Sequence, residues 1–246
     1  MNTWRYLDSG PNTGAVNMAV DEDLLRKAAA GDVVTTLRFY SWDPPAVSTG
    51  RFQDQGTAVN AGACSRCSIH IVRRITGGRA VLHNHELTYS VVSRTDNPLF
   101  PKEVLGTYKV IAAGLLAGLT NLGIPAEMVS RSGRHAALVK KTSKDPSCFS
   151  SPSWYEILVK GRKIIGSAQR RVPGAFLQHG SILIDHDPAE EAEVISGGGL
   201  RDSVTTIQEE LGKEISLEEV KQAFLRGFSE ALALTFQRNE HIQDQH

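Results

Sequence analysis

A cysteine and a lysine lie fifteen positions apart in the stretch 146–181, and their side chains suit acyl transfer. Cys148 precedes a strand-like segment that turns at residues 160–162 and returns with Lys163 at its start. A thiolate attacks thioesters well, and the acyl group then sits on the enzyme in an activated form. A lysine near the site could take the proton that an amine acceptor must lose. The two residues therefore predict a covalent acyl-transfer centre.

A loop rich in arginine and glycine, residues 73–84, is the expected other half of this centre. Its sequence, RRITGGRAVLHN, places Gly77 and Gly78 between arginines. Because glycine has no Cβ, the backbone N–H groups of these two residues could approach a ligand and face a developing oxyanion. The spacing matches neither a phosphate-binding loop nor a dinucleotide fingerprint. A strained hairpin with salt-bridged arginines would have the same composition.

Each of these residues also has a structural interpretation. A free cysteine is commonly a small buried residue, and Lys163 could be a charge at a strand edge. Simple hairpin register places Lys163 opposite about Val159, so spacing does not bring it beside Cys148. Three histidines could each act as a base: His83, His85 and His179. One of them paired with Cys148 would resemble a cysteine hydrolase.

The other two cysteines form the single motif Cys64-x-x-Cys67. A structural zinc ion needs four ligands, and His70 would supply only a third, so we expect no metal site. With three cysteines in all, an odd number, a disulfide framework is not expected. We infer a reducing, cytoplasmic setting.

Composition sets broad limits on the function. The chain has 246 residues, 41% hydrophobic and 22% charged, which suits one large α/β domain or one domain with a small appendage. With 27 basic and 27 acidic residues the net charge is zero, so nucleic acid is not an expected partner. No apolar run reaches the ~20 residues of a membrane span, and the N-terminus has no signal-peptide pattern.

The hydrophobic pattern predicts the elements that position these residues. Helices are expected over 15–30 and 102–122, and strands over 4–7, 33–40, 46–49, 68–73, 86–93, 154–172 and 176–185. A small-residue helix could cover 54–67. The remainder reads as helical, with capping boxes at Thr206-x-x-Glu209 and Ser216-x-x-Glu219.

Two segments allow either a structural or a functional interpretation. Asn17 and Asp21 fall on one face of the first helix, where they form a solvated face or a polar wall of the site. The basic segment 130–146 is expected to be a loop, and it is either a lid over the site or a surface insertion.

Longer motifs resemble a known family. The loop RRITGGRAVLHN with ELTYSVV, then CFSSPSWYEILVKGRKIIGSAQ and LQHGSILID, resembles the biotin/lipoate protein ligase superfamily, and within it the LipM-type octanoyltransferases. WRYLDSG and LRFYSWDPPAVSTGRFQ fit the same pattern. The resemblance implies an α/β fold of the α+β type, with a mixed, curved β-sheet flanked by helices. It implies one catalytic domain over 1–246, with a core of about 4–185 and a C-terminal helical segment of about 186–236.

The resemblance also implies an activity without a cofactor. An octanoyl group would pass from octanoyl-acyl carrier protein through a cysteine thioester to a lysine of a lipoyl domain, in lipoate biosynthesis. The acceptor would be the glycine cleavage H protein or the acyltransferase subunit of a 2-oxoacid dehydrogenase, and the enzyme a cytoplasmic monomer. Cys148 matches the acyl-carrying cysteine, and Lys163 matches the lysine that acts as proton shuttle or carbonyl donor. The substrate-binding residues expected on this basis are Arg73, Gly77, Gly78, Arg79, His83, Gly166, Ser167, Ala168 and His179.

One position departs from the family pattern, and two rival functions stay open. Asn84 stands where the family usually has an aspartate, which could alter loop hydrogen bonding or acceptor preference. An ATP-dependent lipoate–protein ligase of the same superfamily, using ATP and magnesium, is the first rival. A carrier-binding protein that has lost turnover is the second.

Overall fold

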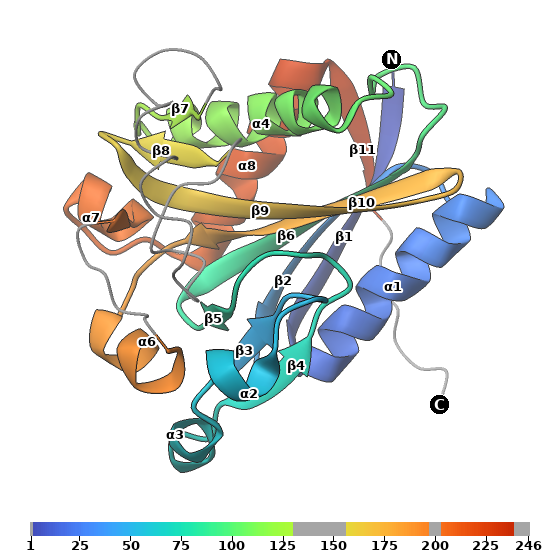
Figure 1. Ribbon diagram of the computed structural model, residues 1–246. Helices are drawn as coiled ribbons and strands as arrows, with labels where there is room; N and C mark the ends of the chain where they lie inside the picture. The colour runs from blue at the N-terminus through green and yellow to red at the C-terminus, as the bar shows by residue number, and fades with distance from the viewer. Residues whose placement is uncertain (1, 130–155, 197–202, 239–246) are drawn as a thin grey trace.

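The computed structural model describes residues 2–129, 156–196 and 203–238. Cys148 and the segment 130–146 lie outside these ranges. An eight-stranded mixed sheet contains, in spatial order, β11 (Leu234–Arg238), β1 (Asn2–Asn12), β2 (Thr36–Trp42), β6 (Glu86–Arg94), β10 (Ala175–Leu183), β9 (Arg162–Val172), β8 (Ile157–Val159) and β7 (Glu127–Met128). A three-stranded sheet contains β4 (His70–Arg73), β3 (Ala46–Thr49) and β5 (Val81–His83). The predicted mixed sheet flanked by helices is confirmed (Figure 1).

The central strands carry one apolar and one polar face, because successive side chains in a strand point to opposite sides. In β2, Leu37 and Phe39 enter the main hydrophobic core, whereas Arg38 and Tyr40 point to the other side. β6 and β10 alternate in the same way. Both faces are buried, so the polar side chains must find partners inside the protein.

Two helices, α4 (Val104–Asn121) and α8 (Leu217–Leu232), cover the apolar face of the large sheet (Figure 1). They approach closely because glycines face the partner helix. A Cβ on Gly118 would lie 2.5 Å from Cδ1 of Phe224, and one on Gly227 would lie 2.3 Å from the backbone nitrogen of Gly118. By length and composition α4 could cross a membrane, but Ile111, Leu115 and Leu119 on one side of it pack into this core.

Helix α1 (Gly14–Ala30) covers the opposite face of the large sheet, as predicted in extent (Figure 1). Thr13 caps its first turn, and Gly31 ends it in the left-handed conformation at φ 87°. Leu24, Leu25 and Ala28 of this helix pack into a hydrophobic cluster with the sheet, whereas Val16 is 45% exposed. Asn17 and Asp21 are fully buried, so the interpretation as a solvated face is wrong.

The predicted hairpin around Gly161 is confirmed for β8 and β9. Lys160 and Gly161 both have positive φ, 50° and 84°, which is typical of the tight turn that joins antiparallel strands. Lys163 lies opposite Leu158 rather than Val159.

Several other elements differ from the sequence prediction. The predicted helix 54–67 is two short helices, α2 (Gln55–Ala58) and α3 (Ala61–Arg66). β1 continues beyond the predicted strand 4–7 to Asn12, with a register shift between Asp8 and Pro11. The C-terminal part contains α6 (Pro188–Val194), α7 (Ile207–Leu211) and α8, and the capping box at Ser216 and Glu219 is confirmed.

The expectation of a wholly helical C-terminal segment is wrong at its end. Residues 234–238 form β11, which pairs in parallel with β1 at the edge of the large sheet. A five-residue strand next to a helix of strong periodicity carries little pattern of its own, so its partner across the sheet decides its conformation.

The close approach of α4 and α8 predicts that Gly227→Ala is destabilising. The added Cβ must push Gly118 away, and such overpacking costs about 1–3 kcal/mol. Gly62→Ala, in α3, meets no atom closer than 3.6 Å and is the matched control, neutral or stabilising by up to about 1 kcal/mol. Urea denaturation of both variants measures the difference, and equal stabilities would contradict the packing.

Candidate active site

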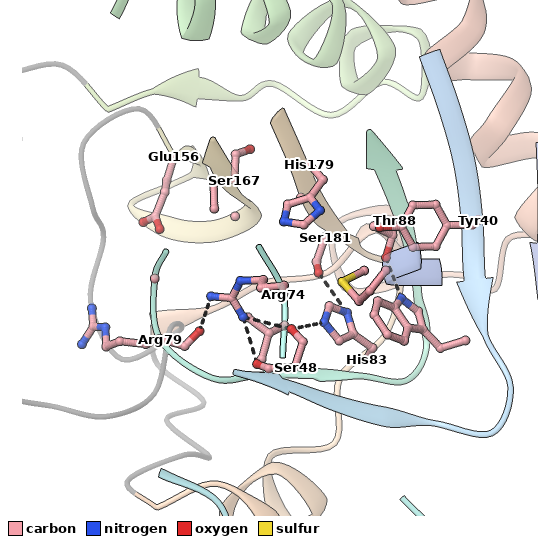
Figure 2. A pocket seen from close by; sticks show the side chains of 17 residues that line it. Tyr40, Ser48, Arg74, Arg79, His83, Thr88, Glu156, Ser167, His179 and Ser181 are labelled. Carbon is pink, nitrogen blue, oxygen red and sulfur yellow. Dashed lines mark hydrogen bonds between the residues drawn. The ribbon is translucent and has the colours of Figure 1, made fainter. Parts of the chain in front are cut away.

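A pocket of about 130 Å³ lies between the polar face of the central strands and the loop that precedes β5 (Figure 2). Figure 2 shows Arg74, Ser48 and His83 along one side of it, and Glu156, Ser167 and His179 along the other. The further lining residues include Met18, Tyr40, Trp42, Val81, Thr88 and Ser181. Apolar and aromatic surface with a few polar groups is typical of a small-molecule site.

The loop 74–79 is held by the buried guanidinium of Arg74. Arg74 is buried, and its guanidinium donates to the carbonyl oxygens of Gly77, Arg79 and Ser48 at 2.7–3.2 Å. A Cβ on Gly50 would lie 1.9 Å from the carbonyl oxygen of Gly78, so the two backbones touch there. Gly78 has φ 97°, a conformation that favours glycine.

The structure brings most of the predicted substrate-binding residues to this pocket. Gly78, Arg79, His83, Gly166, Ser167, Ala168 and His179 line it. Arg73 and Gly77 do not. Arg73 turns outward and donates to the carbonyl oxygens of Gly50, Arg51 and Gln53, so it holds a neighbouring turn instead of the pocket wall.

His83 is held on both ring nitrogens. Nε2 lies 2.7 Å from the hydroxyl of Ser48, and Nδ1 lies 2.8 Å from the carboxylate of Glu86. The ring stacks on Trp42 with centroids 3.9 Å apart. Glu86 follows the short turn after β5, so the spacing His83-x-x-Glu86 joins the small sheet to the large one.

Asp21 is a buried carboxylate with several hydrogen-bond donors around it. It accepts hydrogen bonds from Arg38, Ser90, Tyr40 and His179 at 2.8–3.0 Å, and it is fully buried. Burial acts to raise the pKa of Asp21, but the hydrogen bonds from His179 and Arg38 and the charge of Arg38 outweigh it and hold the pKa below its usual value.

Two of the groups around Asp21, Tyr40 and His179, have defined roles as hydrogen-bond donors. Burial and the adjacent Asp21 carboxylate raise the pKa of Tyr40 well above its usual value, so the Tyr40 hydroxyl stays protonated and donates. His179 donates from Nδ1 to Asp21, and its Nε2 lies 2.7 Å from the hydroxyl of Thr76, in the loop before β5.

Lys163 is buried and forms an ion pair. Its Nζ lies 2.6 Å from Oε1 of Glu156, and both side chains are nearly inaccessible to solvent. Glu156 lines the pocket, whereas Lys163 stands behind it. The expectation of a strand-edge charge is therefore wrong, and Lys163 is an internal cation beside the pocket.

Asn84 has a local explanation. Its side-chain amide donates to both carboxylate oxygens of Glu190, at 3.2 and 2.9 Å. An aspartate here would face that carboxylate with a second negative charge, so asparagine suits this neighbour.

Within the described ranges, no three His, Cys, Asp or Glu side chains are grouped so as to hold a metal ion. Cys64 is buried and Cys67 exposed, both as free thiols, and burial raises the pKa of Cys64.

Sequence reasoning missed several polar residues of the site: Arg38, Ser48, Glu86 and Glu156. For two of these residues the sequence does contain a signal. Arg38 and Glu86 are charged residues inside or at the start of strongly apolar strands, and such charges are buried only with partners. Ser48 carried no signal of its own.

Comparison with known proteins agrees with this architecture. A model of the lipoyl protein ligase A/B catalytic domain matches residues 13–229. The chain belongs to this family. Octanoyltransferase LipM of Brevibacillus brevis is 43% identical over 242 residues, covering 94% of this chain and 88% of that protein. The LipM of Bacillus subtilis is 37% identical over 253 residues, covering 99% and 91%.

Solved structures place the family in a wider group. Lipoate-protein ligase A, crystallised with ATP, has a TM-score of 0.80 at 26% identity and covers 97% of this chain and 89% of its own. A Thermoplasma acidophilum protein with bound lipoic acid has a TM-score of 0.78 at 25% identity, with coverage of 97% and 89%. The predicted family is confirmed, and so is the enzyme class, because the relatives at up to 43% identity are acyltransferases by name.

The bonding of Asp21 predicts a large effect of Asp21→Asn on stability. The change leaves Arg38 as an uncompensated buried charge, which costs about 3–5 kcal/mol at pH 7. Because the folded-state pKa of Asp21 is lowered, its stabilisation is complete above the unfolded pKa of about 3.9 and is lost as pH falls through the folded pKa.

The measurement is chemical denaturation at pH 7 and in increasingly acid buffer. Asp23→Asn, on the exposed side of the same helix, is the control and should change stability by about 1 kcal/mol or less. A parent-like Asp21→Asn at pH 7 would show that the buried network does not stabilise the fold.

Proposed function

We propose that this chain transfers an octanoyl group from octanoyl-acyl carrier protein to a lysine of a lipoyl domain, through a thioester on Cys148. The observation that carries the proposal is the 43% identity to an octanoyltransferase over nearly the whole chain. The pocket supports it, since Met18, Trp42 and Val81 offer apolar surface for an acyl chain.

The reaction would proceed in two transfers. The Cys148 thiolate attacks the donor thioester, and the carrier thiol leaves as the octanoyl group moves to the cysteine sulfur. The acceptor amine then attacks the enzyme thioester, and the sulfur leaves as the amide forms. The two thioesters are chemically alike, so the first transfer is nearly balanced in free energy and needs no ATP.

Lys163 fits the role of a hydrogen-bond donor to the reacting carbonyl oxygen in this scheme. In its ion pair with Glu156 it is an ammonium, which has three N–H donors and no acceptor. A cation held beside the pocket stabilises the negative charge that develops on the carbonyl oxygen in each transfer. Between the two roles that the family resemblance allows, the ion pair favours the carbonyl donor.

The partners and setting belong to the same proposal. The acceptor would be the lipoyl domain of the glycine cleavage H protein or of a 2-oxoacid dehydrogenase acyltransferase subunit. The enzyme would act in the cytoplasm as a monomer.

An ATP-dependent ligase is the second candidate, because a solved ligase that binds ATP shares this fold. Chain length does not distinguish a transferase from a ligase here, since this chain covers 89% of the solved ligase chain. A ligase would activate the free acid as an adenylate and would not require Cys148. A transferase therefore needs Cys148 and no ATP, whereas a ligase needs ATP and not Cys148.

The intact mass of the protein after mixing with octanoyl-acyl carrier protein, without ATP, tests the proposal. We expect the parent to gain one octanoyl group that hydroxylamine removes, and Cys148→Ala to gain none. Cys67→Ala removes an exposed thiol instead and should be acylated like the parent. An adduct of equal extent on Cys148→Ala would exclude the cysteine thioester.

A further inference from the structure

The acceptor lysine of the proposed reaction is an ammonium at neutral pH, since its ordinary pKa is about 10.4. It must lose one proton before its nitrogen can attack and a second as the amide forms. A base that reaches the pocket has to take the first proton. Of the three candidate histidines, His85 is exposed in the turn before β6 and does not line the pocket, whereas His83 and His179 do.

The hydrogen bonds around His83 have defined directions. A guanidinium can only donate, so Arg74 donates to the Ser48 hydroxyl, 2.9 Å away. A carboxylate can only accept, so Nδ1 of His83 donates to Glu86. The remaining bond, between Ser48 and Nε2, runs from the hydroxyl when the imidazole is neutral and from the imidazole when it is protonated. This series of hydrogen bonds can therefore carry a proton from the pocket to His83 without breaking a contact.

A second series of hydrogen bonds also runs from a hydroxyl through a histidine to a carboxylate, and its histidine, His179, lies on the opposite side of the pocket. Thr76 bonds to Nε2 of His179, and Nδ1 of His179 donates to Asp21. The two series of hydrogen bonds differ in how far the negative charge of the carboxylate is compensated by its neighbours. Asp21 already accepts four hydrogen bonds, one of them from the buried guanidinium of Arg38. A proton arriving on His179 would thus face a carboxylate whose charge is already compensated.

Glu86 has no such compensation. Its Oε1 accepts from His83 and Thr88, but its Oε2 is buried and has no hydrogen-bond partner in the part of the chain that the structure describes. Among the described residues, no lysine or arginine forms an ion pair with it, and its side chain is 1% exposed. A buried, half-satisfied carboxylate is costly. A proton on His83 would turn this contact into an ion pair and give the Glu86 carboxylate a cationic partner.

The other groups that face His83 are Trp42, Ser181 and, beyond Ser48, Arg74. The ring of Trp42 lies parallel to the imidazole at 3.9 Å, and an aromatic face attracts a cation. The hydroxyl of Ser181 is 3.5 Å from Nδ1 and neutral. The guanidinium of Arg74 opposes a positive charge on His83, but the Ser48 hydroxyl separates the two, whereas Glu86 is in direct contact.

On the basis of the proposed function, we propose that His83 is the base of the second transfer and that Glu86 positions and supports it. The acceptor ammonium gives one proton to the Ser48 oxygen as the Ser48 proton passes to Nε2 of His83. The neutral amine attacks the acyl carbon, a C–N bond forms and the C–S bond to Cys148 breaks. The second proton of the nitrogen goes to the leaving sulfur, and His83 returns the first to water.

The test separates the two transfers. Parent, His83→Gln and Glu86→Gln are first acylated with octanoyl-acyl carrier protein, and the isolated thioester is then mixed with an apo lipoyl domain. We expect thioester formation to stay within a few-fold of the parent. Transfer to the lysine should fall about 10²-fold in His83→Gln and at least about tenfold in Glu86→Gln. Ser48→Ala, which removes the entry hydroxyl, should also slow only this step.

Hydroxylamine provides the readout that a structural defect would not give. It attacks as a neutral amine, so the His83 and Glu86 variants should transfer their octanoyl group to it at close to the parent rate. His179→Gln, which alters the opposite wall, should slow lysine and hydroxylamine alike. Glu193→Gln, an exposed surface change paired with Arg66, is the control without effect.

Two results would overturn the assignment of His83. One is transfer to the lysine at the parent rate in both His83→Gln and Glu86→Gln. The other is an equal loss with lysine and with hydroxylamine. If the parent itself forms no thioester, the proposed function fails and this step fails with it, so the two failures are distinguishable.

Discussion

The buried carboxylate of Asp21 is the interaction on which the arrangement of the pocket depends. It joins α1 to three neighbouring strands, through Arg38 and Tyr40 of β2, Ser90 of β6 and His179 of β10. A charge inside the protein is stable only when such partners surround it. Helix position, strand register and the orientation of His179 are therefore set together rather than separately.

This constraint follows from the alternation of the strands. β2, β6 and β10 each turn one row of side chains toward α4 and α8 and the other row toward α1 and the small sheet. Because α1, β3 and the loop before β5 cover the second row, its polar side chains are buried and bond to one another. The pocket lies within this polar layer, with His179, Ser181 and Thr88 in its wall.

The local features of this architecture could be predicted from sequence. The turn at Lys160-Gly161, the end of α1 at Gly31 and the cap at Ser216 each depend on a few neighbouring residues, and each is present. Features that depend on distant partners were missed. Nothing near Asp21 indicates the four donors that bury it, and β11 is a strand only because β1 lies beside it.

The candidate site shows the same division. Residue types alone pointed to the glycine loop, and Gly78 lines the pocket, whereas the pairing of Cys148 with Lys163 stays a prediction because Cys148 lies outside the described residues. The ion pair of Lys163 with Glu156 and the bond of His83 to Ser48 depend on the fold, because they join separate strands or sheets. Arg73 was expected to bind substrate, but it points away from the pocket that Arg74 lines, since adjacent residues of an extended segment point to opposite sides.

Because one fold serves both ligases and transferases, a few side chains decide which reaction takes place. The central claim is that this chain is a transferase, and the most direct test compares two acyl sources with the same apo lipoyl domain. One reaction contains octanoyl-acyl carrier protein with all ATP removed, and the other contains free octanoate, ATP and magnesium. We expect octanoylation of the lipoyl domain, measured by mass, only in the first reaction. Octanoylation only in the second would contradict the account and identify an ATP-dependent ligase.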